Sequence, residues 1–81
     1  IPNPASNLFS IFLKKAATHV KDVSVKKVII TDKLGNKKYE ASYTNGKSSQ
    51  NIYVNNLRND IYTVSVFDGQ NWRSEKLSVK H

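Results

Sequence analysis

The sequence predicts an all-β domain, an antiparallel β-sandwich of about seven strands. Valine, isoleucine and threonine number 18, against 4 alanines and no methionine. This bias favours strands, because branched side chains lose χ1 freedom in a helix but pack well on a pleated sheet. The pairs Gly35-Asn36, Asn45-Gly46 and Asp68-Gly69 are typical of hairpin turns. No segment is helical over the length that a parallel crossover needs, so an antiparallel sandwich is expected, with a five-stranded oligonucleotide-binding barrel as the alternative.

Seven strands are expected between the turn signals. In chain order they are Leu8–Leu13, Asp22–Val25, Val28–Thr31, Lys37–Tyr43, Gln50–Val54, Ile61–Phe67 and Trp72–Lys80. The stretch from Ser10 to Val20 has a weak helical period and no convincing cap, so we predict a strand followed by a loop there.

Alternation of apolar residues is clearest in the last two expected strands. Tyr62, Val64 and Val66 share one face of the first, and Leu77 and Val79 share one face of the second.

A change of phase is expected at the Lys26-Lys27 pair. Val23 and Val25 share one parity, whereas Val28 and Ile30 share the other. A one-residue insertion exchanges the two faces of a strand, so the pair marks a bulge or a strand break.

Length, charge and composition limit the possible classes of protein. Eighty-one residues make one domain, near the lower size limit for an unaided hydrophobic core. There is no cysteine, and the longest apolar run is far too short to span a membrane. The net charge of +7 is compatible with a polyanionic partner, but also with lysines that keep strand edges from pairing. Because the chain begins at Ile1 without a leader, we expect a piece of a larger secreted protein.

No catalytic or metal-binding constellation is recognisable, so we expect neither an enzyme nor a cofactor. His19 and His81 have no partner at a ligand or triad spacing, and we expect both to be solvated. The four aspartates lie beside turn signals, where carboxylates accept backbone hydrogen bonds; they are Asp22, Asp32, Asp60 and Asp68.

Aromatic residues beside lysines raise the alternative of a nucleic-acid binder, which would stack bases on rings in a basic groove. However, Tyr39 and Tyr43 are in phase with Ala41, and Tyr62 is in phase with the valines that follow it. Core packing explains these rings better, and no nucleic-acid partner is expected.

Four groups of residues occur in an order that is more specific than any one of them. They are Pro2-Asn3-Pro4-Ala5, then Val28–Thr31 with the turn Asp32-Lys33-Leu34-Gly35, then Ile52–Val54 with Leu57 and Ile61–Val66, and finally Glu75–His81. In this order they resemble the type A C-terminal sorting domain of the type IX (Por) secretion system of Bacteroidetes. Asp60 stands where that family has glycine before Ile-Tyr, a departure that matters if the position needs a positive φ.

The resemblance implies a fold and a function. The fold would be a seven-stranded immunoglobulin-like sandwich spanning residues 1–81, at the C-terminus of a cargo protein. The cargo would enter the periplasm and pass the outer-membrane translocon with the help of shuttle proteins. A cell-surface sortase would then remove the domain, leaving the cargo secreted or at the cell surface.

The residues expected to serve recognition lie in the last strand and in one turn. We expect Leu77–Lys80, with the neighbouring strand Ile61–Phe67, to form an edge that the translocon reads through main-chain bonds and side-chain pockets. Lys76 and Lys80 would add charge, although Leu77 and Val79 suit a core equally well. Asp32 and Gly35 are expected to form a hairpin, with Gly35 in the left-handed conformation. The recognition set is Lys76, Leu77, Val79, Lys80, Tyr62, Asp32 and Gly35.

Two further hypotheses concern the N-terminal segment and an alternative function. Pro2 and Pro4 fix φ and lack N–H donors, so the segment Pro2, Asn3, Pro4 and Ala5 should be extended, keeping a cleavage linker apart from the sandwich. The alternative function is an adhesive or carbohydrate-binding sandwich, with Trp72 and Tyr53 as a sugar platform.

Overall fold

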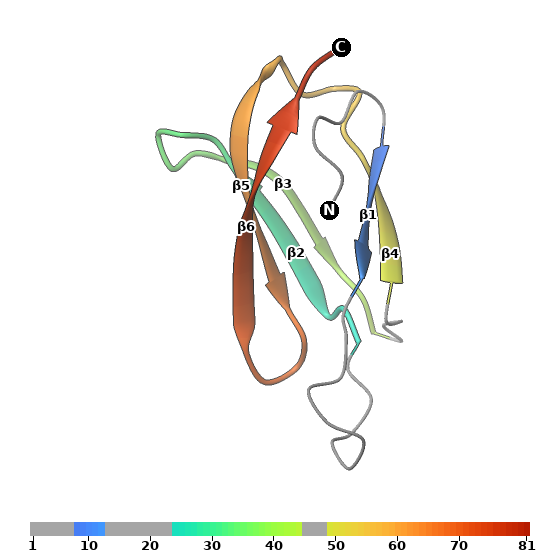
Figure 1. The fold of residues 1–81 in the computed structure, drawn as a ribbon. Helices are drawn as coiled ribbons and strands as arrows, with labels where there is room; N and C mark the ends of the chain where they lie inside the picture. Colours follow the sequence, from blue (N-terminus) through green and yellow to red (C-terminus); the bar gives the residue numbers. More distant parts are fainter. Residues whose placement is uncertain (1–7, 13–23, 45–48) are drawn as a thin grey trace.

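Antiparallel strands make up the whole regular structure of the part of the chain that the computed structural model describes, residues 8–12, 24–44 and 49–81 (Figure 1). No helix occurs in these residues, and accordingly none that could cross a membrane. The strands are β1 (Leu8–Phe12), β2 (Lys27–Thr31), β3 (Lys37–Ser42), β4 (Ser49–Tyr53), β5 (Asp60–Phe67) and β6 (Trp72–Val79).

The strands divide between two sheets. One has four strands in the order β3-β2-β5-β6, and the other pairs β1 with β4. β5 lies between β2 and β6 and pairs with both along most of its length, for example through Val28 opposite Val66 and Tyr62 opposite Leu77. β5 is therefore the central strand of the larger sheet.

The core lies between the two sheets. Alternate residues of β2 and β5 are buried, as are Leu77 and Val79 at the end of β6, and Ile52 of β4 is buried in the same cluster. The cluster consists of Val25, Val28, Ile30, Ile52, Val54, Tyr62, Val64, Val66, Leu77 and Val79. Because both sheets contribute to one core, the arrangement is that of two packed layers rather than of a single closed barrel.

The predicted strands are found with two differences. Six of the seven are present within the described residues. Of the segment Asp22–Val25, only Ser24 and Val25 are described, and neither is in a strand. The change of phase at Lys26-Lys27 is confirmed, because Val25 and Val28 are both buried although their parity differs, and β2 begins only at Lys27. A shift of register that the sequence does not indicate lies between Ile30 and Thr31, where β2 pairs with β3.

Two glycines close hairpins, as their sequence context predicts. Gly35 has φ of +87° in the β2–β3 turn, and Gly69 has φ of +100° in the β5–β6 turn. The Gly35 N–H donates to the Asp32 carbonyl at 3.0 Å. No other described residue has a positive φ, so Asp60 opens β5 without the conformation that glycine would favour. The third predicted turn, Asn45-Gly46, lies outside the described residues.

Gly35→Val should lower the free energy of unfolding by about 1–2 kcal/mol, because a β-carbon is strained in the left-handed region. No heavy atom lies within 4 Å of the position where that β-carbon would be, so the cost is one of backbone conformation and not of a clash. Gly35→Asn should therefore cost clearly less, since asparagine tolerates this region. Urea unfolding of both variants checks this, and equal losses for valine and asparagine would contradict it.

Candidate functional site

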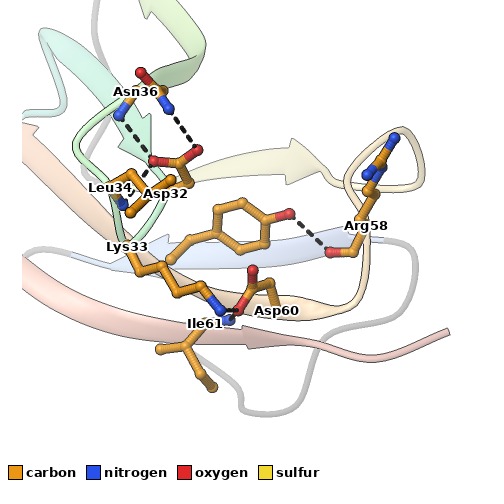
Figure 2. A network of polar contacts seen from close by, with 8 residues as sticks. Asp32, Lys33, Leu34, Asn36, Arg58, Asp60 and Ile61 are labelled. Atoms are coloured by element: carbon orange, nitrogen blue, oxygen red, sulfur yellow. Dashed lines mark hydrogen bonds and ion pairs between the residues drawn. The ribbon is translucent and has the colours of Figure 1, made fainter.

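Three separate segments meet at one end of the larger sheet, which we call the loop end: residues 32–36, 54–61 and 80–81. Lys33 Nζ lies 3.7 Å from Asp60 Oδ1, which joins the β2–β3 turn to the start of β5 (Figure 2). The His81 backbone N–H donates to Asn59 Oδ1 at 2.9 Å, and the His81 ring is hydrogen-bonded to the Leu57 carbonyl. The residues after β6 are thus held against the loop that precedes β5.

Asp32 organises the turn at the loop end. Its Oδ1 accepts hydrogen bonds from the backbone N–H groups of Asn36 at 2.8 Å and Leu34 at 2.9 Å. The Asn36 side-chain amide donates to Oδ2 at 3.2 Å. The backbone N–H of Asn36 is the main reason that the pKa of Asp32 is lowered from its ordinary value of 3.8. Asp32 is therefore an ionised turn-forming carboxylate.

Tyr62 connects the core to the loop. Its ring belongs to the buried cluster, and its hydroxyl donates a hydrogen bond to the Arg58 carbonyl at 2.8 Å (Figure 2). Burial raises the pKa of Tyr62, and the nearby Asp60 carboxylate adds to this effect. The hydroxyl therefore stays neutral and donates its hydrogen bond to the Arg58 carbonyl, which holds the loop against the start of β5.

A depression of about 380 Å³ opens between the turn and the loop. Its lining is of mixed charge: Asp32, Lys38, Asn56, Leu57, Arg58, Asp60 and Tyr62. Within the described part of the chain, no group of three His, Asp or Glu side chains is placed to hold a metal ion. The arrangement offers charged and apolar contacts to a binding partner.

The family model described as "Secretion system C-terminal sorting domain" matches residues 1–80. The chain belongs to this family of type IX secretion sorting domains. No curated protein and no solved structure matches it. The sorting-domain match covers residues 32–36 and 54–61 of the loop end, together with Lys80.

The recognition residues predicted for this sorting domain fall into two groups. Asp32, Gly35 and Lys80 are at or beside the loop end, and Tyr62 lies directly beneath it. Leu77 and Val79 are in the core, as one of the two interpretations predicts, and Lys76 is exposed with its Nζ donating to Thr63 Oγ1 at 3.0 Å. Pro2, Asn3, Pro4 and Ala5 lie outside the described residues.

The predicted edge needs correction for one of its two strands. Among the described strands, β6 is at the end of the sheet order, as expected, but β5 is paired on both sides. Residues Thr63–Phe67 of β5 are paired with β2 on one side and with β6 on the other, so this part of the strand has no free backbone edge for a partner.

The loop itself was not predicted as part of the site. The composition of this polar segment, which contains Asn56, Arg58 and Asn59, indicates only a turn. Leu57 is the one residue of the segment that belongs to the sequence motif. The exposed side chain of His81 agrees with the prediction that it is solvated, but its hydrogen bond to the Leu57 carbonyl was not predicted. A contact between residues 24 positions apart leaves no local signal in the sequence.

The proposed sugar platform of Trp72 and Tyr53 is not formed. Trp72 pairs with Phe67 at the start of β6, and their ring centroids are 5.2 Å apart. Tyr53 ends β4 shortly before the loop that holds His81, which places it near the opposite end of β6 (Figure 1). Eight strand residues span roughly 25 Å, so one sugar cannot stack on both rings.

Asp32→Asn should reduce the pH dependence of folding stability. The folded state binds the Asp32 proton less tightly than the unfolded chain, since its pKa is lowered. The carboxylate therefore stabilises the fold above its ordinary pKa, and this contribution is lost as the pH falls through the lower folded value. Urea unfolding at pH 6 and pH 3 should show the wild type losing more stability than the variant. Parallel losses in the two proteins would contradict the assignment.

Proposed function

We propose that this sorting domain directs a cargo protein through the type IX translocon, aided by shuttle proteins, and that a cell-surface sortase then removes it. The family match over residues 1–80 carries the proposal, since the family consists of secretion signals that lie C-terminal to their cargo. Export across the outer membrane to the cell surface or the medium follows from membership. The translocon, shuttle and sortase contacts, and the absence of catalytic activity, are our proposal.

A signal shared by different cargo proteins has to be recognised through features of its own. We infer that residues 1–81 form one immunoglobulin-like unit, which is supported by the single core between the two sheets. Such a unit presents the same surface whatever precedes it. The loop end is the best candidate for this surface, because three motif segments meet there. Main-chain pairing along β6 is a further proposed contact, supported by its position in the sheet order.

The proposal is tested by export of a fluorescent protein that has a periplasmic export signal and carries residues 1–81 at its C-terminus. In a host with an active type IX system, the reporter should reach the cell surface or the medium. A version without Lys76–His81 should remain in the periplasm. That deletion removes Leu77 and Val79 from the core, so retention by itself does not separate recognition from folding.

A shorter deletion supplies the matched control. Removing only Lys80 and His81 keeps both core residues and removes the bonds to Leu57 and Asn59. The domain should still melt cooperatively by circular dichroism while export falls. The proposal would be contradicted if the full-length fusion stayed in the periplasm of cells that export a known type IX cargo.

A further inference from the structure

The first four residues of β6, Trp72–Glu75, are exposed on both faces of the strand. Among the described strands, β6 is at the end of the sheet order and is paired with β5 alone. These residues lie in the half of β6 away from the loop end, because Trp72 is opposite Phe67 whereas Val79 is opposite Asp60. We call Trp72–Glu75 the edge segment.

The main-chain groups of Ser74 are directed away from β5. In the β5–β6 turn, the Asp68 N–H donates to the Asn71 carbonyl at 3.1 Å, which makes these two residues a hydrogen-bonded pair. Hydrogen-bonded and non-hydrogen-bonded pairs alternate along an antiparallel ladder. Arg73 and Glu75 therefore direct their main-chain groups toward β5, and Ser74 offers its N–H and its carbonyl on the opposite side of the strand.

The two strands at the ends of the sheet order differ in their protection against pairing with another chain. β3 begins with Lys37 and Lys38, and its pairing with β2 contains the shift of register at Thr31. Lysines and bulges are devices that keep an edge strand from pairing. The edge segment of β6 has no lysine, and its register with β5 is regular. Its backbone is therefore suited to pair with a further strand.

The charges of the edge segment are complementary to those of a second copy in one antiparallel register. When the Ser74 residues of two copies lie opposite each other, Arg73 of each chain lies opposite Glu75 of the other. The two Ser74 residues then exchange both main-chain hydrogen bonds, and each Arg–Glu pair is of the non-hydrogen-bonded kind, in which side chains are closest. A centre at Arg73 or at Glu75 would instead place identical charges opposite each other, which destabilises a sheet.

Both charged side chains can take part in such a contact. Glu75 is exposed, and within the described part of the chain no ion pair involves its carboxylate. Arg73 Nη2 lies 3.3 Å from Asp68 Oδ2, and 48% of the arginine side chain is exposed. Because a guanidinium has five N–H donors, Arg73 can keep this contact and bind a second carboxylate.

We propose that two copies of this domain pair antiparallel through their edge segments, centred on Ser74, so that their two four-stranded sheets become one continuous sheet. The contact is short, whereas stable interfaces bury roughly 1,200–2,000 Å². A weak dimer with a Kd on the order of 1 mM is expected. The inference goes beyond the proposed function: the dimer leaves the loop end uncovered, and it competes with any main-chain contact that the export machinery makes on the first half of β6.

Sedimentation equilibrium of the 81-residue chain tests the dimer. The experiment covers about 0.05 to 2 mM protein in about 0.15 M salt, which screens the net charge of the two copies. The weight-average mass should rise from 9.2 kDa toward twice that value. A mass that stays at 9.2 kDa over the whole range would overturn the proposal.

Exchange of charges tests the register. Arg73→Glu and Glu75→Arg should each weaken the dimer about tenfold or more, because each places like charges opposite each other twice. A 1:1 mixture of the two variants should associate again, since every such pair in the mixed dimer joins opposite charges. The variants change the net charge of +7 in opposite directions, so general repulsion between basic chains would weaken only Glu75→Arg. Unchanged or stronger association of Arg73→Glu, or a mixture that stays monomeric, would overturn the proposal.

Ser74→Pro tests the main-chain bonds, and Ser74→Ala is its matched control. Both variants lose the 3.1 Å contact between the Ser74 and Ser65 hydroxyls, but only proline removes the N–H that is directed away from β5. Proline is tolerated at a sheet edge where the N–H faces solvent, so cooperative melting by circular dichroism should be retained. Ser74→Ala should dimerise as the wild type does, and Ser74→Pro should stay monomeric. Equal association of the two variants would overturn the proposal, and if Ser74→Pro does not fold, the charge mixture decides.

Discussion

The alternation of side chains along β5 is the constraint on which the other parts of the structure depend. Tyr62, Val64 and Val66 lie on one face, and the strand is paired with β2 and β6 on its two sides. The register of these pairings places Val28, Ile30, Leu77 and Val79 on that same face. A one-residue slip would turn these side chains toward solvent, so a single strand fixes the faces of its neighbours.

The position of the loop end follows from this arrangement. β5 begins at Asp60 opposite Val79, so the segment before β5 and the segment after β6 are brought to the same end of the sheet. The hydroxyl of Tyr62, a core residue, reaches out of the core to the Arg58 carbonyl. The residues that build the core therefore also set the position of the residues that we propose to bind a partner, which links folding to recognition.

Sequence reasoning was sufficient for features that depend on local chemistry. The period of two in β5 and β6, the phase change at Lys26-Lys27 and the left-handed glycine at position 35 are each determined by neighbours in the chain. The turn-forming role of Asp32 and Asp68 is of the same kind, with Asp68 Oδ1 accepting the N–H groups of Gln70 and Asn71. The order of strands in the sheet depends on contacts between residues that are distant in the chain, so the sequence does not distinguish the central position of β5 from an edge position.

The candidate binding surface could not be predicted from the sequence either, because its residues come from segments that are distant in the chain. Lys33 and Asp60 meet only because the pairing of β2 with β5 brings the β2–β3 turn near the start of β5. The contacts of His81 with Leu57 and Asn59 likewise join distant positions. Most residues of the family's motifs lie in the core or in turns. They indicate which segments form the surface, but not which side chains are exposed on it.

We propose that the loop end, and not the opposite end of the larger sheet, faces the export machinery. Photo-crosslinking in secreting cells tests it, with a photoreactive amino acid replacing either the exposed Leu34 or the exposed Trp72. We expect crosslinks from position 34 to an outer-membrane component of the type IX system, and none from position 72. Crosslinks from position 72 alone would contradict it.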